Sequence, residues 1–458
     1  MRRKSQKVIL ALMLIFAIIS ASLVMSVASF TSENQKSLLK FKLRNPTGYN
    51  LTHVITITNL GVFPIHKAVL KVPLIGNSTP FHFSFIEKIE RNMNYGFIKM
   101  DSDPYLNHYV VWEIGEIEPK KQVTLKIVYT LVSFHVYFQI NAGNIEKYDK
   151  SSEIYQLYTQ PEDYIESNDP EIIRVAQEIV GNETNPYLKA MRIAVFIEDN
   201  IAYEPQNQER GAKWALTNRK GDCSEYSYLF TALCRAVGIP ARIQAGFSFH
   251  TDDEVIDQGH MWAEYYLENY GWIPVDLTWR QINQLDNLHF SSLQTFPPDY
   301  PYDNCYFYYS NLKIEASFQQ KISIKRIEPE YIQNFTMAHQ TYLAVSRIQN
   351  AEFFLSLAKI LGANVFFISD CQRIEQMIDE NDLNIQFALE NNDSQSLLLT
   401  KSQIENLEVA AKQLFLKELM LTLTLIVIIA IIISVLLKRG RKEIQKSEKL
   451  EGNETIFP

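Results

Sequence analysis

Three residues in the middle of the chain have the types and the spacing that acyl-transfer chemistry needs. Cys223 follows a Gly-Asp pair, His260 comes 37 residues later, and Asp276 comes 16 residues after the histidine. A cysteine can attack a carbonyl carbon, a histidine can take and return the proton, and a carboxylate can fix the imidazole tautomer. The sequence therefore predicts a Cys223–His260–Asp276 triad that works through a covalent acyl-enzyme.

The cysteine must be positioned by a helix that starts at it. The residues from Cys223 to the Gly-Ile-Pro at 238–240 predict a helix, and its free backbone N–H groups and dipole favour a thiolate at the first turn. Cys234 lies about three turns along the same helix between apolar neighbours, so we expect it in the core. A buried structural role is the alternative for Cys223, but the preceding turn places its thiol at an exposed helix start.

His260 and Asp276 are predicted on the two strands of one hairpin. A four-residue loop would pair Asp276 with Ala263, on the wrong face of the strand. A three-residue loop over 268–270 pairs it with Trp262 instead, which places Asp276 diagonally to His260 and within side-chain reach. We expect the three-residue loop, or a bulge with the same effect.

Other groups complete the predicted site. The backbone N–H of Cys223 is one expected oxyanion donor, and Tyr203 and Trp214 are both candidates for a second. His53 and His250 have no metal-ligand partners at useful spacing, and neither a metal nor a cofactor is expected. Cys305 and Cys371 could form a disulfide outside the cell.

The segment that carries these residues resembles the transglutaminase-like superfamily, in its microbial membrane-anchored branch. The matching marks, over about residues 165–285, are Gly-Asp-Cys, Leu-Phe-x-Ala-Leu-x-Arg-Ala-x-Gly-Ile-Pro-Ala-Arg, His-x-Trp-x-Glu and Gly-Trp-x-Pro-Val-Asp-x-Thr. The resemblance implies a papain-like α+β fold, thiol acyl-enzyme chemistry, and catalytic roles for Cys223, His260 and Asp276. Relatives include cross-linking transamidases, peptidases and amidases, so it does not choose between these reactions.

Two uncharged apolar segments frame the chain. Val8–Ala28 has 21 residues and follows four basic residues, and Leu419–Leu437 has 19 residues and precedes four. As helices they would be roughly 28–31 Å long, enough to cross a bilayer core. The positive-inside rule places both basic flanks in the cytoplasm. We therefore expect a cell-membrane protein with an extracytoplasmic catalytic domain, and with one span or two according to whether the first segment is cleaved.

Changes of pattern along the chain predict six segments, which are a signal peptide or N-terminal anchor (1–30), an all-β immunoglobulin-like sandwich (31–160), the transglutaminase-like catalytic domain (161–320), a helical stalk (321–415), a transmembrane helix (416–438) and a cytoplasmic tail (439–458). Short alternating strands separated by turns indicate the sandwich. Helices followed by antiparallel strands indicate the α+β catalytic domain.

The charge balance and the triad together limit the function. The net charge of −8 argues against a nucleic-acid partner, and four cysteines in 458 residues exclude a disulfide scaffold. We expect a membrane-anchored cysteine-dependent acyltransferase or hydrolase, of transglutaminase or cysteine protease type, whose substrate is a protein, peptide or cell-envelope amide. The alternatives are a catalytically silent binding or scaffold protein, and a sensor or adhesion protein that uses the sandwich. The oligomeric state is not predicted.

Overall fold

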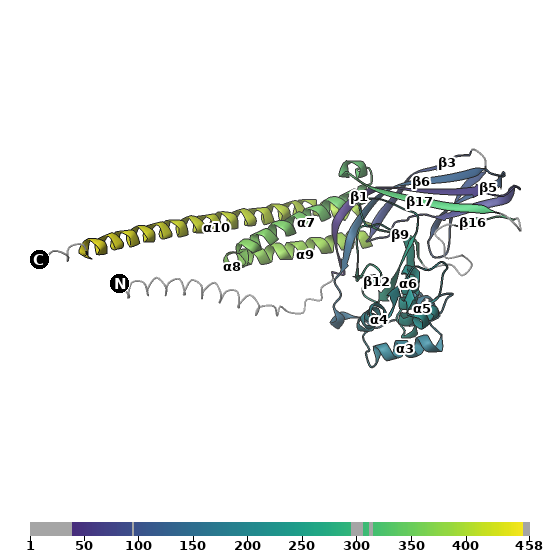
Figure 1. Ribbon diagram of the computed structural model, residues 1–458, viewed down its shortest axis with the longest axis horizontal. Helices are drawn as coiled ribbons and strands as arrows, with labels where there is room; N and C mark the ends of the chain where they lie inside the picture. The colour runs from purple at the N-terminus through teal and green to yellow at the C-terminus, as the bar shows by residue number, and fades with distance from the viewer. Residues whose placement is uncertain (1–38, 94–95, 295–305, 311–314, 452–458) are drawn as a thin grey trace. The chain divides into compact units, whose positions relative to one another are not determined.

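The computed structural model describes residues 39–93, 96–294, 306–310 and 315–451 (Figure 1). The predicted N-terminal signal or anchor and Cys305 lie outside these residues. The chain divides into a larger unit, residues 38–346 with 382–400, and a second unit that contains residues 347–381 and 401–458.

Two sheets of the larger unit pack into a β-sandwich. The first sheet has the order β10-β17-β1-β6-β14, with β3 also paired to β6, and the second has the order β16-β2-β5-β4. Their strands are β1 (Phe41–Asn59), β2 (Ile65–Pro73), β3 (His82–Arg91), β4 (Phe97–Ser102), β5 (His108–Ile117), β6 (Gln122–Phe138), β10 (Asp253–Ile256), β14 (Gln284–Leu285), β16 (Tyr306–Tyr308) and β17 (Ala316–Ile327).

Period-two alternation explains which faces of these strands meet. On β6, Val123, Leu125, Ile127 and Tyr129 are all buried, because alternate side chains of a strand point to the same face. They share one core with residues of β1, β2, β5 and β17, among them the fully buried Trp112. The structure thus contains a two-sheet β-sandwich, whereas the immunoglobulin-like part of the prediction stays a prediction.

Helices and a separate five-stranded sheet form the α+β part of the larger unit. The helices are α2 (Glu153–Tyr158), α3 (Pro170–Val180), α4 (Pro186–Asn200), α5 (Ala212–Asn218) and α6 (Cys223–Ala236), and a short parallel pair joins β7 (Ala202–Tyr203) to β8 (Lys220–Gly221). The sheet has the order β13-β12-β11-β9-β15, with β9 (Ala241–Ser248), β11 (His260–Leu267), β12 (Gly271–Asp276), β13 (Gln281–Ile282) and β15 (His289–Gln294).

Local signals set the helix boundaries in this part. Asp169 caps α3 by accepting from a backbone N–H of its first turn, and Asn185 does the same for α4. Proline is the first residue of both helices, where its missing N–H costs nothing. The predicted helices of this region are confirmed.

The sandwich and the α+β part share strands and core. Strands β10 and β14, which come from the α+β segment, pair with β17 and β6 of the sandwich. Phe247, Phe249 and Phe290 of the α+β segment are buried in the sandwich core. Strand β17 crosses the predicted boundary at residue 320 and pairs with β1 along 12 residues. The stalk therefore starts after this strand, and the two predicted domains form one packed body.

Helices make up the C-terminal part of the chain. They are α7 (Thr336–Leu361), α8 (Ala363–Phe366), α9 (Ile368–Glu390) and α10 (Ser394–Glu451). Helix α10 continues without a break through the apolar run 419–437, as predicted. Within the described residues it is the one helix that is long and apolar enough to cross a membrane. The side of the membrane on which the larger unit lies stays a prediction.

Candidate active site

The thiol of Cys223 lies at the first residue of helix α6. A capping box fixes this turn, since Asp222 Oδ1 accepts from the Ser224 N–H at 3.1 Å and Glu225 Oε2 accepts from the Asp222 N–H at 2.9 Å. Cys223 is partly exposed, whereas Cys234 is fully buried and its burial raises the pKa of its thiol. The two cysteines of the helix therefore have the environments that the sequence predicted.

The hairpin of β11 and β12 brings the histidine and the aspartate together. Leu267 pairs with Gly271, so residues 268–270 form the three-residue loop that we predicted. Asp276 consequently falls on the same face as His260, and its Oδ2 lies 2.5 Å from His260 Nε2. A charge-assisted hydrogen bond joins the two side chains.

The remaining nitrogen of His260 is left for the cysteine. Cys223 is close enough to His260 to raise the pKa of the imidazole, and Nδ1 is the ring nitrogen left for the thiol because Nε2 is held by Asp276. Burial alone would lower the pKa of His260, but the Asp276 carboxylate and the hydrogen bonds to Asp276 and Cys223 raise it to about 9. The imidazole is therefore held in its cationic form at neutral pH.

Asp276 is buried and fully engaged by hydrogen bonds. Its Oδ1 accepts from the backbone N–H groups of Thr278 and Trp279, both at 3.0 Å, and from the Thr278 hydroxyl at 2.7 Å. Burial would raise the pKa of this carboxyl, but His260 and His289 hold the pKa well below its usual range. Asp276 is thus a fixed anion that orients the imidazole.

His289 is part of the site and was missed by the sequence reasoning. On strand β15, its Nε2 lies 3.3 Å from Asp276 Oδ2, and its Nδ1 lies 2.7 Å from Asp286 Oδ1. Burial would lower the pKa of His289, but the two carboxylates raise it to about 9. The local spacing Asp286-x-x-His289 was the only signal in the sequence, because the contact with Asp276 depends on the pairing of β15 with β9.

The ligand-type atoms of His260, Asp276 and His289 all lie within 4.8 Å of one another, which invites a test for a metal site. Two ligands of a tetrahedral zinc ion lie roughly 3.4 Å apart, given bonds of about 2.1 Å. The 2.5 Å separation of His260 Nε2 and Asp276 Oδ2 is shorter than this and has the length of a hydrogen bond. The geometry therefore fits a proton-linked chain better than a metal centre.

The two candidates for the second oxyanion donor have different surroundings. Tyr203 lies beside the turn that precedes Cys223, through the pairing of β7 with β8. Burial raises the pKa of Tyr203, and the nearby Cys223, Asp222 and Asp276 raise it further, so its hydroxyl keeps the proton that it would donate. Trp214 instead stacks against the Arg210 guanidinium, 5.4 Å from the ring centroid. The surroundings favour Tyr203 as the donor.

Two tryptophans surround the histidine pair. The Trp279 ring lies 5.8 Å from the His260 ring and 5.0 Å from the His289 ring, between centroids. The Trp262 ring lies 6.1 Å and 5.4 Å from the same two rings. These aromatic walls exclude water from the ion pairs, which strengthens each electrostatic contact.

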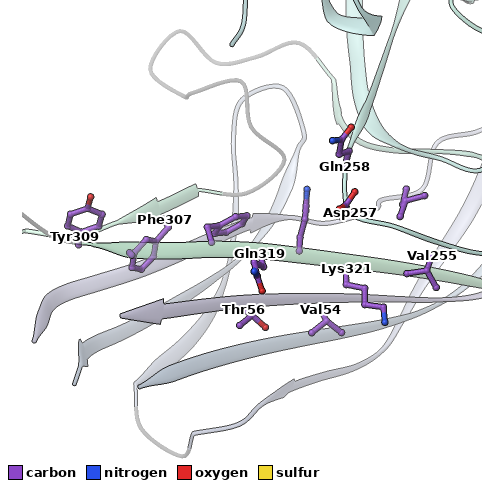
Figure 2. Close-up of a pocket in the computed structure, with 13 residues that line it drawn as sticks. Val54, Thr56, Val255, Asp257, Gln258, Phe307, Tyr309, Gln319 and Lys321 are labelled. Carbon is purple, nitrogen blue, oxygen red and sulfur yellow. The ribbon is translucent and has the colours of Figure 1, made fainter. Parts of the chain in front are cut away.

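A groove of about 1160 Å³ lies on the sandwich side of the unit, lined by β1, β10, β17 and aromatic residues at β16. Figure 2 shows Asp257 and Gln258 next to the strand that carries Gln319 and Lys321. None of the three triad residues lines the groove. Gln258, which lines the groove, precedes His260 by two positions in the sequence.

Comparisons with known proteins place part of the chain in a family. Residues 173–277 match the family described as the transglutaminase-like superfamily. An uncharacterized protein of Haemophilus influenzae is 29% identical over 165 residues, and the match covers 29% of this chain and 44% of that protein, so less than half of the relative is spanned.

Solved structures of the same kind are distant. A proposed cysteine protease from Cytophaga hutchinsonii has a TM-score of 0.45 and 17% identity, and the match covers 62% of this chain and all of the other. Red sea bream transglutaminase has a TM-score of 0.23 and 11% identity, with 51% and 48% of the two chains covered. Residues 173–277, which contain the triad, form a domain of the transglutaminase-like superfamily.

Proposed function

We propose that the protein is a membrane-anchored thiol acyl-transfer enzyme that acts on protein or peptide amides through a Cys223 acyl-enzyme. The observation that carries the proposal is the grouping of Cys223, His260 and Asp276, in which the imidazole is hydrogen-bonded to the carboxylate at 2.5 Å and lies near enough to Cys223 for its pKa to be raised by that residue. This order of groups is what nucleophilic catalysis by cysteine requires.

The chemistry follows from the order of these groups. Cys223 Sγ, as a thiolate, attacks the amide carbon, and the oxyanion is held by the Cys223 backbone N–H and the Tyr203 hydroxyl. His260 gives its proton to the leaving amine, and a thioester remains on the cysteine. Water or a second amine then attacks the thioester, loses its proton to His260, and releases the free thiolate. Water gives hydrolysis, and an amine gives transamidation.

Helix α10 supports the anchor, because its run from Leu419 to Leu437 is exposed and uncharged. The positive-inside rule places the catalytic unit outside the cytoplasm. The second candidate is a binding or scaffold protein that has lost turnover. All three residues of the triad are present, so the site gives no reason to prefer this candidate.

The test is labelling and turnover of the full-length protein. Iodoacetamide near neutral pH should alkylate Cys223 far faster than the buried Cys234, as read by mass spectrometry of the two peptides. Cys223→Ala should abolish release of ammonia from a glutamine-donor peptide, measured with and without an added amine, and His260→Ala should abolish it while slowing the labelling of Cys223. Cys371→Ala is the matched control and should retain turnover.

Two results would contradict the proposal. Equal labelling of Cys223 and Cys234 in the folded protein would remove the nucleophile assignment. Fast labelling of Cys223 without turnover on any amide donor would favour the binding protein instead.

A further inference from the structure

The turn between α7 and α9 carries an uncharged, apolar sequence that is exposed. We call residues 360–368 the helical tip; their sequence is Ile-Leu-Gly-Ala-Asn-Val-Phe-Phe-Ile, with Lys359 before it and Asp370 shortly after it. Ile360 is 79% exposed, Phe366 57% and Ile368 52%. Apolar side chains gathered at this density on a protein surface mark an interaction site.

Contacts with α10 fix the level of the helical tip along that helix. A Cβ placed on Gly362 would lie 3.2 Å from Glu418 Oε1, and Lys417 Nζ lies 3.9 Å from Asp370 Oδ2. All of these residues belong to the second unit of the chain. Figure 1 shows α8 beside α10, at the end of α7 and α9 where the chain turns from one helix to the other. The tip therefore lies level with residues 417 and 418, directly before the apolar run that starts at Leu419.

We propose that the helical tip is embedded in the bilayer interface beside the span, as a second, non-spanning contact of the protein with lipid. The inference rests on the proposal that α10 crosses the membrane. A surface at the level of Leu419 then meets headgroups and the ends of acyl chains, where phenylalanine and isoleucine are favoured over charged residues.

The charges around the tip agree with this occupant. Lys359, which directly precedes the tip, pairs with Glu375, and Asp370, two residues after the tip, is near Lys417. Charged groups therefore flank the apolar residues of the tip at both of its ends. This arrangement gives the hairpin a defined depth, because inserting it further would bury these charges in hydrocarbon.

Tryptophan quenching in vesicles tests the inference with the full-length protein. Phe366→Trp, Val409→Trp and Ile428→Trp are each reconstituted in phosphatidylcholine vesicles without brominated lipid, with lipids brominated near the headgroup end of the acyl chains, or with lipids brominated near the middle of the bilayer; each variant is compared at the depth that quenches it most. The wild-type signal is subtracted, since five native tryptophans contribute to it. Val409 is the matched control, because it is 53% exposed but lies ten residues before Leu419, about 15 Å from it along the helix.

The expected result is that Phe366→Trp is quenched to within about twofold of Ile428→Trp, while Val409→Trp is not quenched. Quenching of Ile428→Trp without quenching of Phe366→Trp would overturn the helical-tip proposal alone. In that case a blue-shifted but unquenched emission from the Phe366→Trp variant would identify a protein partner, such as a second copy of the chain. Absence of quenching at Ile428→Trp would overturn the membrane span itself, and the tip proposal with it.

Discussion

Replacing Asp276 by asparagine removes the charge that keeps His260 cationic, and this change can be followed in the pH dependence of Cys223 alkylation. In the native protein the carboxylate raises the pKa of His260 to about 9 although burial opposes it. Asparagine keeps a hydrogen bond but not the charge, so burial should bring the pKa of His260 to about 6.5 or below. The difference corresponds to about 3 kcal/mol of lost stabilisation of the imidazolium.

The sign of the effect follows from this shift. The imidazolium is present below a pH of about 9 in the native protein and would be present only below about 6.5 in the Asp276→Asn variant. Iodoacetate is an anion and is drawn to Cys223 by the neighbouring positive charge, so its rate should fall where that charge is lost. The fall should move from about pH 9 to about pH 6.5 or lower.

Neutral iodoacetamide and a second carboxylate variant are the controls. Iodoacetamide lacks the attraction and should show a smaller change in the same region. Asp286→Asn removes a carboxylate that contacts His289 and not His260, so it should leave the iodoacetate profile close to native. An unchanged profile in Asp276→Asn would refute the reasoning. Turnover should fall in this variant less than in Cys223→Ala or His260→Ala, since the aspartate takes no proton itself.

Three further changes probe the surroundings of the site. His289→Asn should lower kcat with little change in KM, because the Asp276 carboxylate loses one of its hydrogen-bond partners but stays in place. The decrease should be smaller than in Asp276→Asn, and steady-state kinetics on the peptide donor would measure both. Burial lowers the pKa values of both His53 and His82 from 6.5 to about 4, so each histidine contributes about 3 kcal/mol of stability that is present above pH 6.5 and is lost as the pH drops from 6.5 through 4, and His82→Gln should make that part of a denaturant-unfolding series less steep. In Gly246→Ala the new Cβ would lie 2.0 Å from the Phe290 carbonyl oxygen, which should cost ~1–3 kcal/mol or more in unfolding free energy, whereas Gly76→Ala, with open space around its Cβ, should unfold like the native protein.

The parts of the site that could be predicted are those set by neighbours in sequence. Asp222 precedes Cys223 and caps its helix, so the exposed helix start is a local property. The register of the β11–β12 hairpin follows from its loop length and the required face of Asp276. These two local elements already bring a cysteine, a histidine and an aspartate into a plausible order, which is why the triad could be derived before the fold was known.

The parts that could not be predicted depend on pairing between distant segments. Strand β17 pairs with β1, which lies more than 250 residues earlier in the sequence, and the pattern of neither strand predicts which strand it pairs with. Arg44 and the bulge before Thr47 interrupt the alternation along β1, so the sequence pattern does not show that this strand starts at Phe41. Arg44 is buried there because Asp382 of α9 meets its guanidinium with two contacts of 2.8 Å, a partner 338 residues away. A buried arginine is tolerated when a carboxylate pairs with it, and a sequence pattern cannot show which distant carboxylate does so.

Long-range pairing also decides whether the α+β segment can fold by itself, and we expect that residues 161–320 cannot. Without the sandwich, β10 and β14 lose their partner strands, and Phe247, Phe249 and Phe290 lose the core in which they are buried. Exposing three phenylalanines costs roughly 5–9 kcal/mol, at about 1.5–3 kcal/mol each, which is comparable to the whole stability of an ordinary domain. The fragment should therefore be insoluble or lack cooperative unfolding, whereas residues 31–418, which keep both sheets, should unfold cooperatively. A soluble, cooperatively folded 161–320 fragment with a reactive Cys223 would show that the sandwich is an independent domain after all. Failure of the fragment would mean that the sandwich supports the strands that hold His260 and Asp276.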